Sequence, residues 1–213
     1  WGSPAGVPFV LVQVIAEESS RVLNMVGAAG DVCVNGVSPS VAHTVGASGT
    51  ARVVHEPAAI ISYLLFNLRN PVLADRRVRQ AIASAVDREA ILRDLFFGMG
   101  QVADSMLPAE HWAYQAPQRP IRFDLEAAER LLDEAGLPVD PERGERFRLV
   151  LKISNNRLRR LIGRRLAEDL ARIGVGVDLV SYELGTFLAD IRKGNFDLSL
   201  LQLPDALEPD LYH

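Results

Sequence analysis

The sequence predicts an α/β fold with a mixed sheet and flanking helices, and three observations support this. Apolar, β-branched runs of strand length alternate along the chain with segments whose apolar residues recur at helical spacing. Glycine and proline separate most of these segments. The 213 residues, 48% of them hydrophobic, suffice to bury the core of one substantial domain.

The first quarter of the chain predicts three strands and two helices. Residues 7–15 are β-branched and apolar, which is typical of a strand, and residues 17–29 carry apolar side chains at helical spacing up to a glycine. Residues 31–35 and 50–54 are predicted as short strands. Between them, Ser38 and Pro39 open a second helix, with serine as the N-cap and proline in the first turn.

The most hydrophobic strand is predicted at residues 58–67, and a series of helices follows it. Asn70 and Pro71 end the strand, and Asp75 is the expected N-cap of a helix with one apolar face. A second helix is predicted at residues 90–97, before two glycines. The aromatic and proline-rich stretch 106–120 is predicted to be an irregular connection.

The second half predicts strands joined by crossover helices. Asp124 caps a predicted helix at 125–135, and a charged turn at 139–146 follows. The remaining elements are a strand at 147–153, a helix at 157–173, a strand at 175–180, a helix at 186–193 and a strand at 196–203. This alternation of strands and helices predicts β-α-β units on a mixed sheet. We see no internal repeat, so residues 1–213 are predicted to form a single α/β lobe.

Several classes of function find no support in the sequence. The net charge of −4 argues against a general nucleic-acid binder. The single Cys33 and the scattered histidines have no metal-ligand spacing, so we expect no metal site. No nucleophile elbow, P-loop or dinucleotide-binding glycine motif occurs, and we expect neither an enzyme nor a cofactor.

Charged residues in the second half have simple structural interpretations. Glu183 and Asp197, near predicted strand ends, are interpreted as solvated turn acids rather than as a general acid and base. The arginine-rich face of helix 157–173, interrupted by Glu168 and Asp169, is interpreted as a solvated outer face.

Membrane and export signals are not evident. The first residues carry no charged region ahead of an apolar one, so no signal peptide is recognisable. No apolar run approaches the roughly 20 residues that a membrane-spanning helix needs.

Several motifs, in order, resemble one protein family. They are Tyr63-Leu-Leu-Phe-Asn67 with Arg77-Val-Arg-Gln-Ala-Ile82 and Ala85-Val-Asp-Arg-Glu-Ala-Ile91, then Ala127-Ala-Glu-Arg-Leu-Leu-Asp-Glu-Ala-Gly136, Leu166-Ala-Glu-Asp-Leu-Ala-Arg-Ile-Gly-Val175 and Gly194-Asn-Phe-Asp-Leu198. Together they resemble the solute-binding proteins of dipeptide and oligopeptide ABC importers, also called family 5. Gly30-Asp-Val32 resembles an earlier turn of that family, which commonly has a second aspartate at the position of Cys33.

The resemblance implies a role in transport. Members of the family are longer and have two lobes that close on a ligand, and this chain is similar to most of one large lobe. The implied function is the substrate-binding component of an ABC importer, which binds a short peptide or similar polar solute and delivers it to a membrane permease. The implied location is periplasmic or extracytoplasmic, with the signal peptide absent from this fragment.

The ligand-binding candidates lie in the stretch from residue 202 to residue 210. In peptide-binding members, an aspartate at the position of Asp205 pairs with the peptide's α-amino group, and an acid and a proline follow, here Glu208 and Pro209. A carboxylate in a water-excluding cleft suits an ammonium group, although a loop aspartate also commonly caps a turn. Leu201 and Gln202 replace the family's glycine and tryptophan, so Gln202 either hydrogen-bonds a polar ligand or faces the interior of the full protein.

The sequence leaves four interpretations open. The ligand is a peptide in the first interpretation and an oligosaccharide or metal chelate in the second. In the third, the lobe is the ligand-sensing domain of a transcriptional regulator, which an N-terminal helix-turn-helix would favour and a signal peptide would refute. An enzyme built on a similar lobe would require turnover that one point change abolishes.

Overall fold

A computed structural model describes residues 6–27, 29–34, 37–55, 60–109 and 111–203. The contacts of the chain divide it into two compact units, Trp1–Val54 and His55–His213. The prediction of a single lobe over residues 1–213 therefore stays a prediction.

The first unit contains two helices, as predicted. Helix α1 covers Glu18–Val26, where the Glu17 carboxylate accepts a hydrogen bond from the Ser20 backbone N–H at 2.7 Å. Helix α2 covers Pro39–Ser48, with proline in its first turn and Gly49 at its left-handed C-cap. Among the described residues of this unit only Ala42 is buried, so it has little core of its own.

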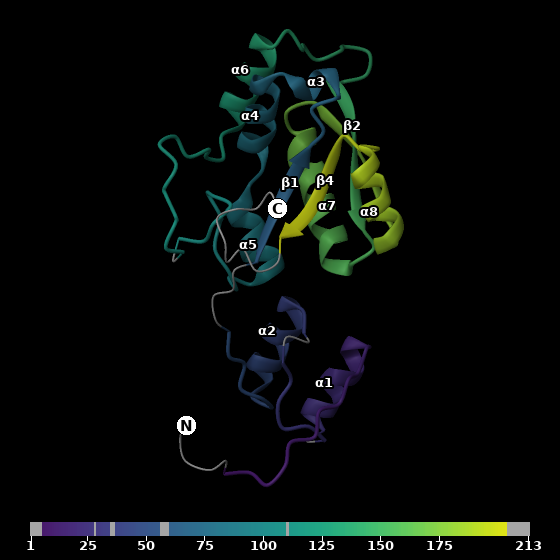
Figure 1. The fold of residues 1–213 in the computed structure, drawn as a ribbon. Helices are drawn as coiled ribbons and strands as arrows, with labels where there is room; N and C mark the ends of the chain where they lie inside the picture. Colours follow the sequence, from purple (N-terminus) through teal and green to yellow (C-terminus); the bar gives the residue numbers. More distant parts are fainter. Residues whose placement is uncertain (1–5, 28, 35–36, 56–59, 110, 204–213) are drawn as a thin grey trace. The chain divides into compact units, whose positions relative to one another are not determined.

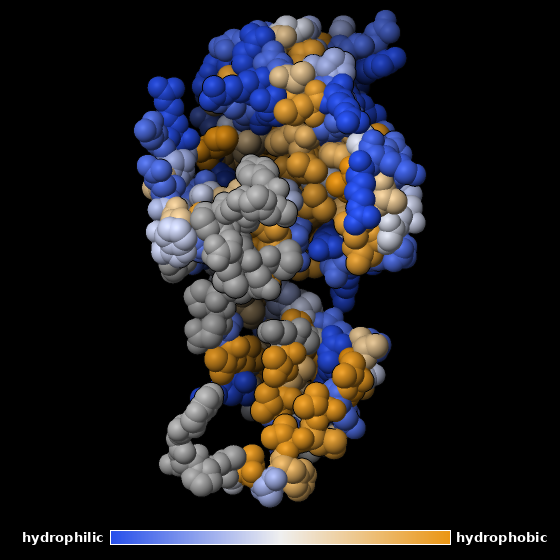
Figure 2. All heavy atoms as spheres, viewed as in Figure 1, coloured by the Kyte–Doolittle hydropathy of each residue, from blue (hydrophilic) through white to orange (hydrophobic). Residues whose placement is uncertain are grey.

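The three strands predicted in this unit are wrong for the residues that the structure describes. Residues 7–15, 31–34 and 50–54 have no strand assignment. Apolar side chains of the first segment are strongly exposed, as Phe9 at 81% and Val14 at 95% illustrate, and Figure 2 shows apolar atoms at the surface of this unit. A strand is stable only when a neighbouring strand satisfies its backbone hydrogen bonds, and no described segment of this unit pairs with residues 9–15.

The second unit is built on a mixed four-stranded sheet. Its strands are β1 (Ile61–Phe66), β2 (Phe147–Ser154), β3 (Val175–Tyr182) and β4 (Leu198–Leu203), in the order β1-β4-β2-β3. Strands β3 and β4 run parallel to β2, whereas β1 pairs antiparallel with β4 from Ile61↔Leu203 to Phe66↔Leu198. The predicted fold class is confirmed (Figure 1).

Helices join and cover these strands, and their starts follow the sequence signals. The helices are α3 (Pro71–Ala74), α4 (Arg76–Ala85), α5 (Arg88–Phe96), α6 (Leu125–Glu134), α7 (Arg157–Ala171) and α8 (Leu184–Lys193). The Asp75 and Asp124 side chains accept backbone hydrogen bonds at the starts of α4 and α6, as predicted. Glu183 caps α8 in the same way, so α8 begins at Leu184, two residues before the predicted start at residue 186.

The core lies on one face of the sheet, against α4, α6 and α7. Successive side chains of β2 alternate between faces, and Leu149, Leu151 and Ile153 are buried in this core. Helix α8 covers the other face of β2 and β3, where its buried Phe187 anchors it. Figure 1 shows α7 and α8 on opposite sides of the sheet.

A partly buried ion pair joins α8 to the sheet. Lys152 of β2 has its side chain only 8% exposed, and its Nζ lies 2.6 Å from Oδ2 of Asp190 in α8 and 5.1 Å from the centre of the Tyr182 ring. The carboxylate and the aromatic face together compensate the ammonium charge in this poorly solvated position.

Asp190→Asn is expected to lower the free energy of unfolding near neutral pH and to have little effect in acid. Hydrogen bonds, mainly from Lys152 and then from Asn195, hold the pKa of Asp190 below its usual value. Such a carboxyl adds stability above its unfolded-state pKa, about 3.9, and this contribution is lost as the pH falls through the lower folded-state pKa.

Thermal unfolding at about pH 7 and about pH 2.5 measures this difference on either side of the unfolded-state pKa. The matched control is Asp178→Asn, because the Asp178 side chain is 52% exposed and its pair with Arg148 contributes little at the surface. An Asp190→Asn defect that stays undiminished in acid would contradict the prediction.

Two acids interpreted as solvated are bonded within the fold, which corrects both interpretations. Asp197 is half-buried, and its carboxylate accepts hydrogen bonds from the Val150 backbone N–H and from the Asn70 side chain, each at 2.8 Å. Asp169 is only 2% exposed and accepts a hydrogen bond from the Asp87 backbone N–H at 3.1 Å.

Candidate functional site

The carboxyl ends of the three parallel strands meet at one edge of the sheet. Helix α7 leaves β2 toward one face, and α8 leaves the neighbouring β3 toward the other. In open α/β sheets, such a divergence of connections creates the crevice where ligands bind. Ser154, Tyr182 and Gln202 stand at this edge, so we take it as the candidate site, the carboxyl edge.

One side chain of helix α7 connects two of these strands. Arg159 lies in the first turn, where Asn156 caps the helix through the Arg159 backbone N–H at 3.2 Å. The guanidinium of Arg159 donates Nη1 to the Ser154 hydroxyl at the end of β2 and Nη2 to Oε1 of Gln202, at 3.4 Å. Ser154 is buried and Arg159 half-buried, whereas Gln202 is exposed.

Of the predicted site residues, the structure describes Gln202. Gln202 lies on β4 opposite Ser62 of β1, at the carboxyl edge, and its side-chain oxygen is bonded to Arg159. Its side chain is exposed in this unit, and the choice between a ligand and the interior of the full protein stays a prediction. Asp205 and Glu208 lie outside the described residues, so their roles stay predictions.

Sequence reasoning missed Arg159, which it placed in the solvated basic face of the helix. The available signal was its position: the first turn of a helix that directly follows a parallel strand always reaches the carboxyl edge of the sheet. Polar residues at strand ends are the usual candidates in such a fold, and Arg159 lies instead in the first turn of the following helix.

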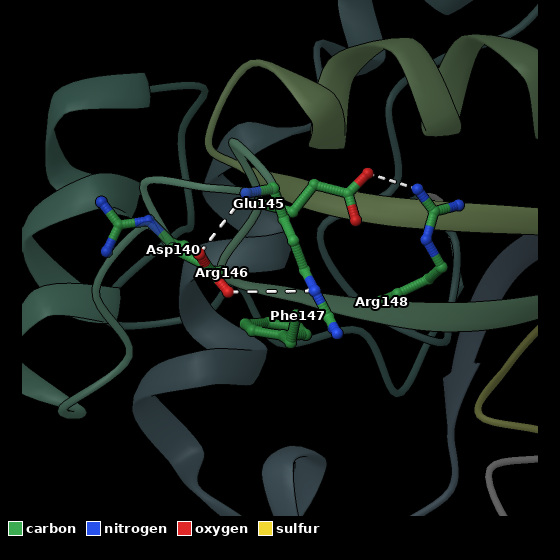
Figure 3. A pocket seen from close by; sticks show the side chains of 6 residues that line it. Asp140, Glu145, Arg146, Phe147 and Arg148 are labelled. Atoms are coloured by element: carbon green, nitrogen blue, oxygen red, sulfur yellow. Dashed lines mark hydrogen bonds and ion pairs between the residues drawn. The ribbon is translucent and has the colours of Figure 1, made fainter.

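The opposite edge holds a cavity of about 410 Å³ lined by charged residues (Figure 3). Its charges are largely paired with one another. The Arg146 side chain, 6% exposed, pairs with Asp133 and donates to the Leu137 carbonyl at 2.6 Å, while Arg148 pairs with Glu145 and with Asp178. Because these charged groups are already paired within the protein, we interpret the cavity as a structural feature at the start of β2 rather than as a ligand site.

Membrane-spanning and metal-binding features are a separate question. Within the part of the chain that the structure describes, no helix is long and apolar enough to cross a membrane. In that same part, no group of three histidine, cysteine or acidic side chains gathers in a way that could hold a metal ion.

Comparison with known proteins identifies a family. The profile of the bacterial extracellular solute-binding proteins, family 5 Middle, matches residues 1–211. The dipeptide-binding protein of Escherichia coli K12 is 30% identical over 141 residues, which are 65% of this chain and 26% of that protein. Heme-binding protein A of Haemophilus influenzae is 32% identical over 134 residues, 63% of this chain and 24% of that protein.

A solved structure shares the fold. NikA from Brucella suis, in complex with Fe(III)-EDTA, has a TM-score of 0.80 at 24% sequence identity, covering 93% of this chain and 42% of that one. The chain thus spans about a quarter of the length of the two curated relatives and less than half of the solved one.

Proposed function

Because this chain belongs to the bacterial extracellular solute-binding proteins of family 5, we propose that it is part of the substrate-binding component of an ABC importer. The whole protein binds a short peptide or a similar small polar solute outside the cytoplasm and delivers it to a membrane permease. The observation that carries this proposal is the family match over residues 1–211. The name of the Escherichia coli relative supports a peptide as ligand.

Under this proposal the chain supplies one lobe of a two-lobed protein, and the ligand lies against the carboxyl edge. Contacts from both lobes close the cleft. Asp205, two residues after β4 ends at Leu203, provides the carboxylate for the ligand's ammonium group. Glu208, three residues further along the sequence, is the second acidic candidate for a ligand contact.

No covalent chemistry is needed for this role. The ligand binds the closed state more tightly than the open state and thereby shifts the population toward closure. The permease distinguishes the two states, and ATP hydrolysis takes place on separate subunits. Accordingly, the protein is a binding protein rather than an enzyme.

A non-peptide ligand is the second candidate. Two similar proteins support it: one is named for heme, and the other was solved with Fe(III)-EDTA. In this chain the family's glycine and tryptophan are replaced by Leu201 and Gln202, which removes an aromatic wall and adds a polar group.

The test is isothermal titration of the whole protein with a pool of di- to pentapeptides. Asp205→Ala is expected to weaken peptide binding about tenfold or more, because a buried ammonium group loses its partner. The control is Glu129→Ala, which removes an exposed acid from α6 and should leave the affinity unchanged. Absence of binding to every peptide, together with binding of Fe(III)-EDTA, would replace the peptide with a chelate as the ligand.

A further inference from the structure

The outer side of helix α7 carries three exposed arginines. These are Arg157, Arg160 and Arg164, whose spacings of three and four residues place them along one side of the helix. We propose that these arginines, the α7 basic face, bind the anionic phosphate groups of phospholipids at the membrane surface. The inference rests on the proposed function, which brings the protein to a membrane, and goes beyond it by assigning a second surface with a second partner.

The side chains of α7 divide between core and solvent. Its inner side packs into the core through three buried apolar residues, Ile162, Leu166 and Leu170. The three arginines of the basic face lie on the opposite side and are exposed. Since an α-helix rises 1.5 Å per residue, Arg157 and Arg164 are about 10 Å apart along the helix axis. The face is therefore a short row of positive charge that the core does not use.

Acids of the same unit do not neutralise this row. Within the described part of the chain, no ion pair involves an arginine of the basic face. Arg160 donates to the Asn155 carbonyl at 2.8 Å, which leaves its charge uncompensated. Glu168, also exposed, lies one turn beyond Arg164, so three positive charges stand against one negative charge on this side. The chain as a whole has a net charge of −4, so the basic face is a local reversal of charge.

Phosphate groups suit these side chains. A guanidinium is always charged, is weakly hydrated, and donates two parallel N–H bonds to a phosphate. Basic residues on the polar side of an amphipathic helix are typical of helices that lie on anionic membranes. Each arginine close to such a surface raises the affinity by a factor of roughly 5. Three arginines together therefore suffice for weak and reversible binding.

The composition of the face favours a lipid surface over a protein partner. Stable protein interfaces are anchored by aromatic or other large side chains that fit pockets of the partner. The outer side of α7 offers one large apolar side chain among the arginines, Leu161, which is 39% exposed. Mobile headgroups rearrange around the guanidinium groups, so they require no such fit.

The position of the face connects this contact with the proposed function. Arg157 is the first residue of α7, and this helix directly follows the carboxyl end of β2. The basic face therefore begins at the carboxyl edge. A contact between this face and the membrane holds that edge close to the bilayer, where the permease receives the ligand.

Co-sedimentation of the whole protein with lipid vesicles tests the proposal. One vesicle type consists of phosphatidylcholine, and the other contains equal parts of phosphatidylcholine and the anionic phosphatidylglycerol. The wild type should sediment with the anionic vesicles at low salt and should be released as the salt concentration rises, because salt screens exposed charges. It should bind the neutral vesicles much more weakly.

Variants then locate the binding on the protein. Combined replacement of the three arginines by glutamine should weaken binding to the anionic vesicles at least about tenfold. Glu168→Gln makes the opposite change in charge and should strengthen this binding about fivefold, which loss of folding cannot imitate. The matched control replaces three arginines that are also exposed but lie beside an acid, Arg93, Arg130 and Arg143. It changes the net charge equally and should weaken binding much less.

The outcomes separate the two proposals, because solute binding is measured independently by titration. Loss of vesicle binding in the triple variant, with a gain in Glu168→Gln, supports the lipid contact. Absence of binding by the wild type, or equal weakening by the triple variant and its control, overturns the contact and leaves the proposed function standing. Binding only to neutral vesicles that carry the permease would assign the face to an acidic protein surface and also overturn it. Vesicle binding without binding of any solute overturns the proposed function alone.

Discussion

Asp197→Ala is expected to lower the free energy of unfolding by about 2 to 4 kcal/mol, because it leaves two polar groups without their carboxylate partner. The Asp197 carboxylate accepts from the Val150 backbone N–H and from Asn70 Nδ2, both at 2.8 Å. Val150 belongs to β2, and Asn70 is the N-cap of α3. Removing the carboxylate therefore removes one side-chain hydrogen bond from the start of β4 to each of these two elements.

Asn67 extends the same network along the backbone. Its N–H donates to the Asp197 carbonyl at 2.9 Å, and its side-chain amide donates to the carbonyls of Gly194 and Phe196 at 2.9 and 2.7 Å. Two motifs that are far apart in the sequence, Tyr63-Leu-Leu-Phe-Asn67 and Gly194-Asn-Phe-Asp-Leu198, thus meet through these bonds. The network fixes where β4 begins and, through its register with β1, where Gln202 stands at the carboxyl edge.

Urea unfolding of the whole protein measures this effect, with Glu183→Ala as the comparison. Sequence reasoning assigned Glu183 and Asp197 to the same class, but the Glu183 carboxylate makes one N-cap bond, to the Gly185 N–H at 2.7 Å. Loss of such a cap costs about 1 kcal/mol. Equal losses for the two variants would show that the Asp197 network contributes no more than an ordinary cap.

Most elements of the second unit were predictable because their signals are local. Helix α4 starts at the predicted cap Asp75, and β2 and α7 start at the predicted residues. Strand β4 begins at Leu198, two residues later than predicted, because Asp197 and the residues before it serve the network with Asn67 and Asn70. A side-chain network between distant segments leaves no periodic pattern in the sequence.

The prediction of strands at residues 7–15 and 50–54 was wrong for a different reason. Their composition is that of strands, but a strand also requires a partner, and partner choice is a tertiary property. The candidate site shows the same limit. Gln202 was predicted from its place in a motif, whereas Arg159 becomes a candidate only when the parallel pairing of β2 with β4 places its helix start beside Gln202.

The burial of Asp169 could not be predicted from the sequence either. Its substitution is the second change with a large expected effect on stability. Asp169→Ala is expected to lower the free energy of unfolding by about 2 to 4 kcal/mol. Its carboxylate accepts from the Asp87 N–H at 3.1 Å and pairs with Arg165 at 3.1 Å and, more distantly, with Arg172 at 3.9 Å. Asp87 is the N-cap of α5, so Asp169 fastens the start of α5 to α7.

The cost of this substitution arises mainly from the partly buried Asp87 backbone N–H rather than from the arginines. Arg165 and Arg172 keep side chains that are 27% and 49% exposed, so water solvates their charges once Asp169 is gone. Asp169→Asn retains an oxygen for the Asp87 N–H and should lose only about 1 kcal/mol. The neighbouring exposed Glu168→Ala should change stability by less than about 0.5 kcal/mol. If denaturant unfolding instead placed Asp169→Asn level with Asp169→Ala, the ion pairs would be the dominant contribution, and the fastening of α5 through the Asp87 backbone would be secondary.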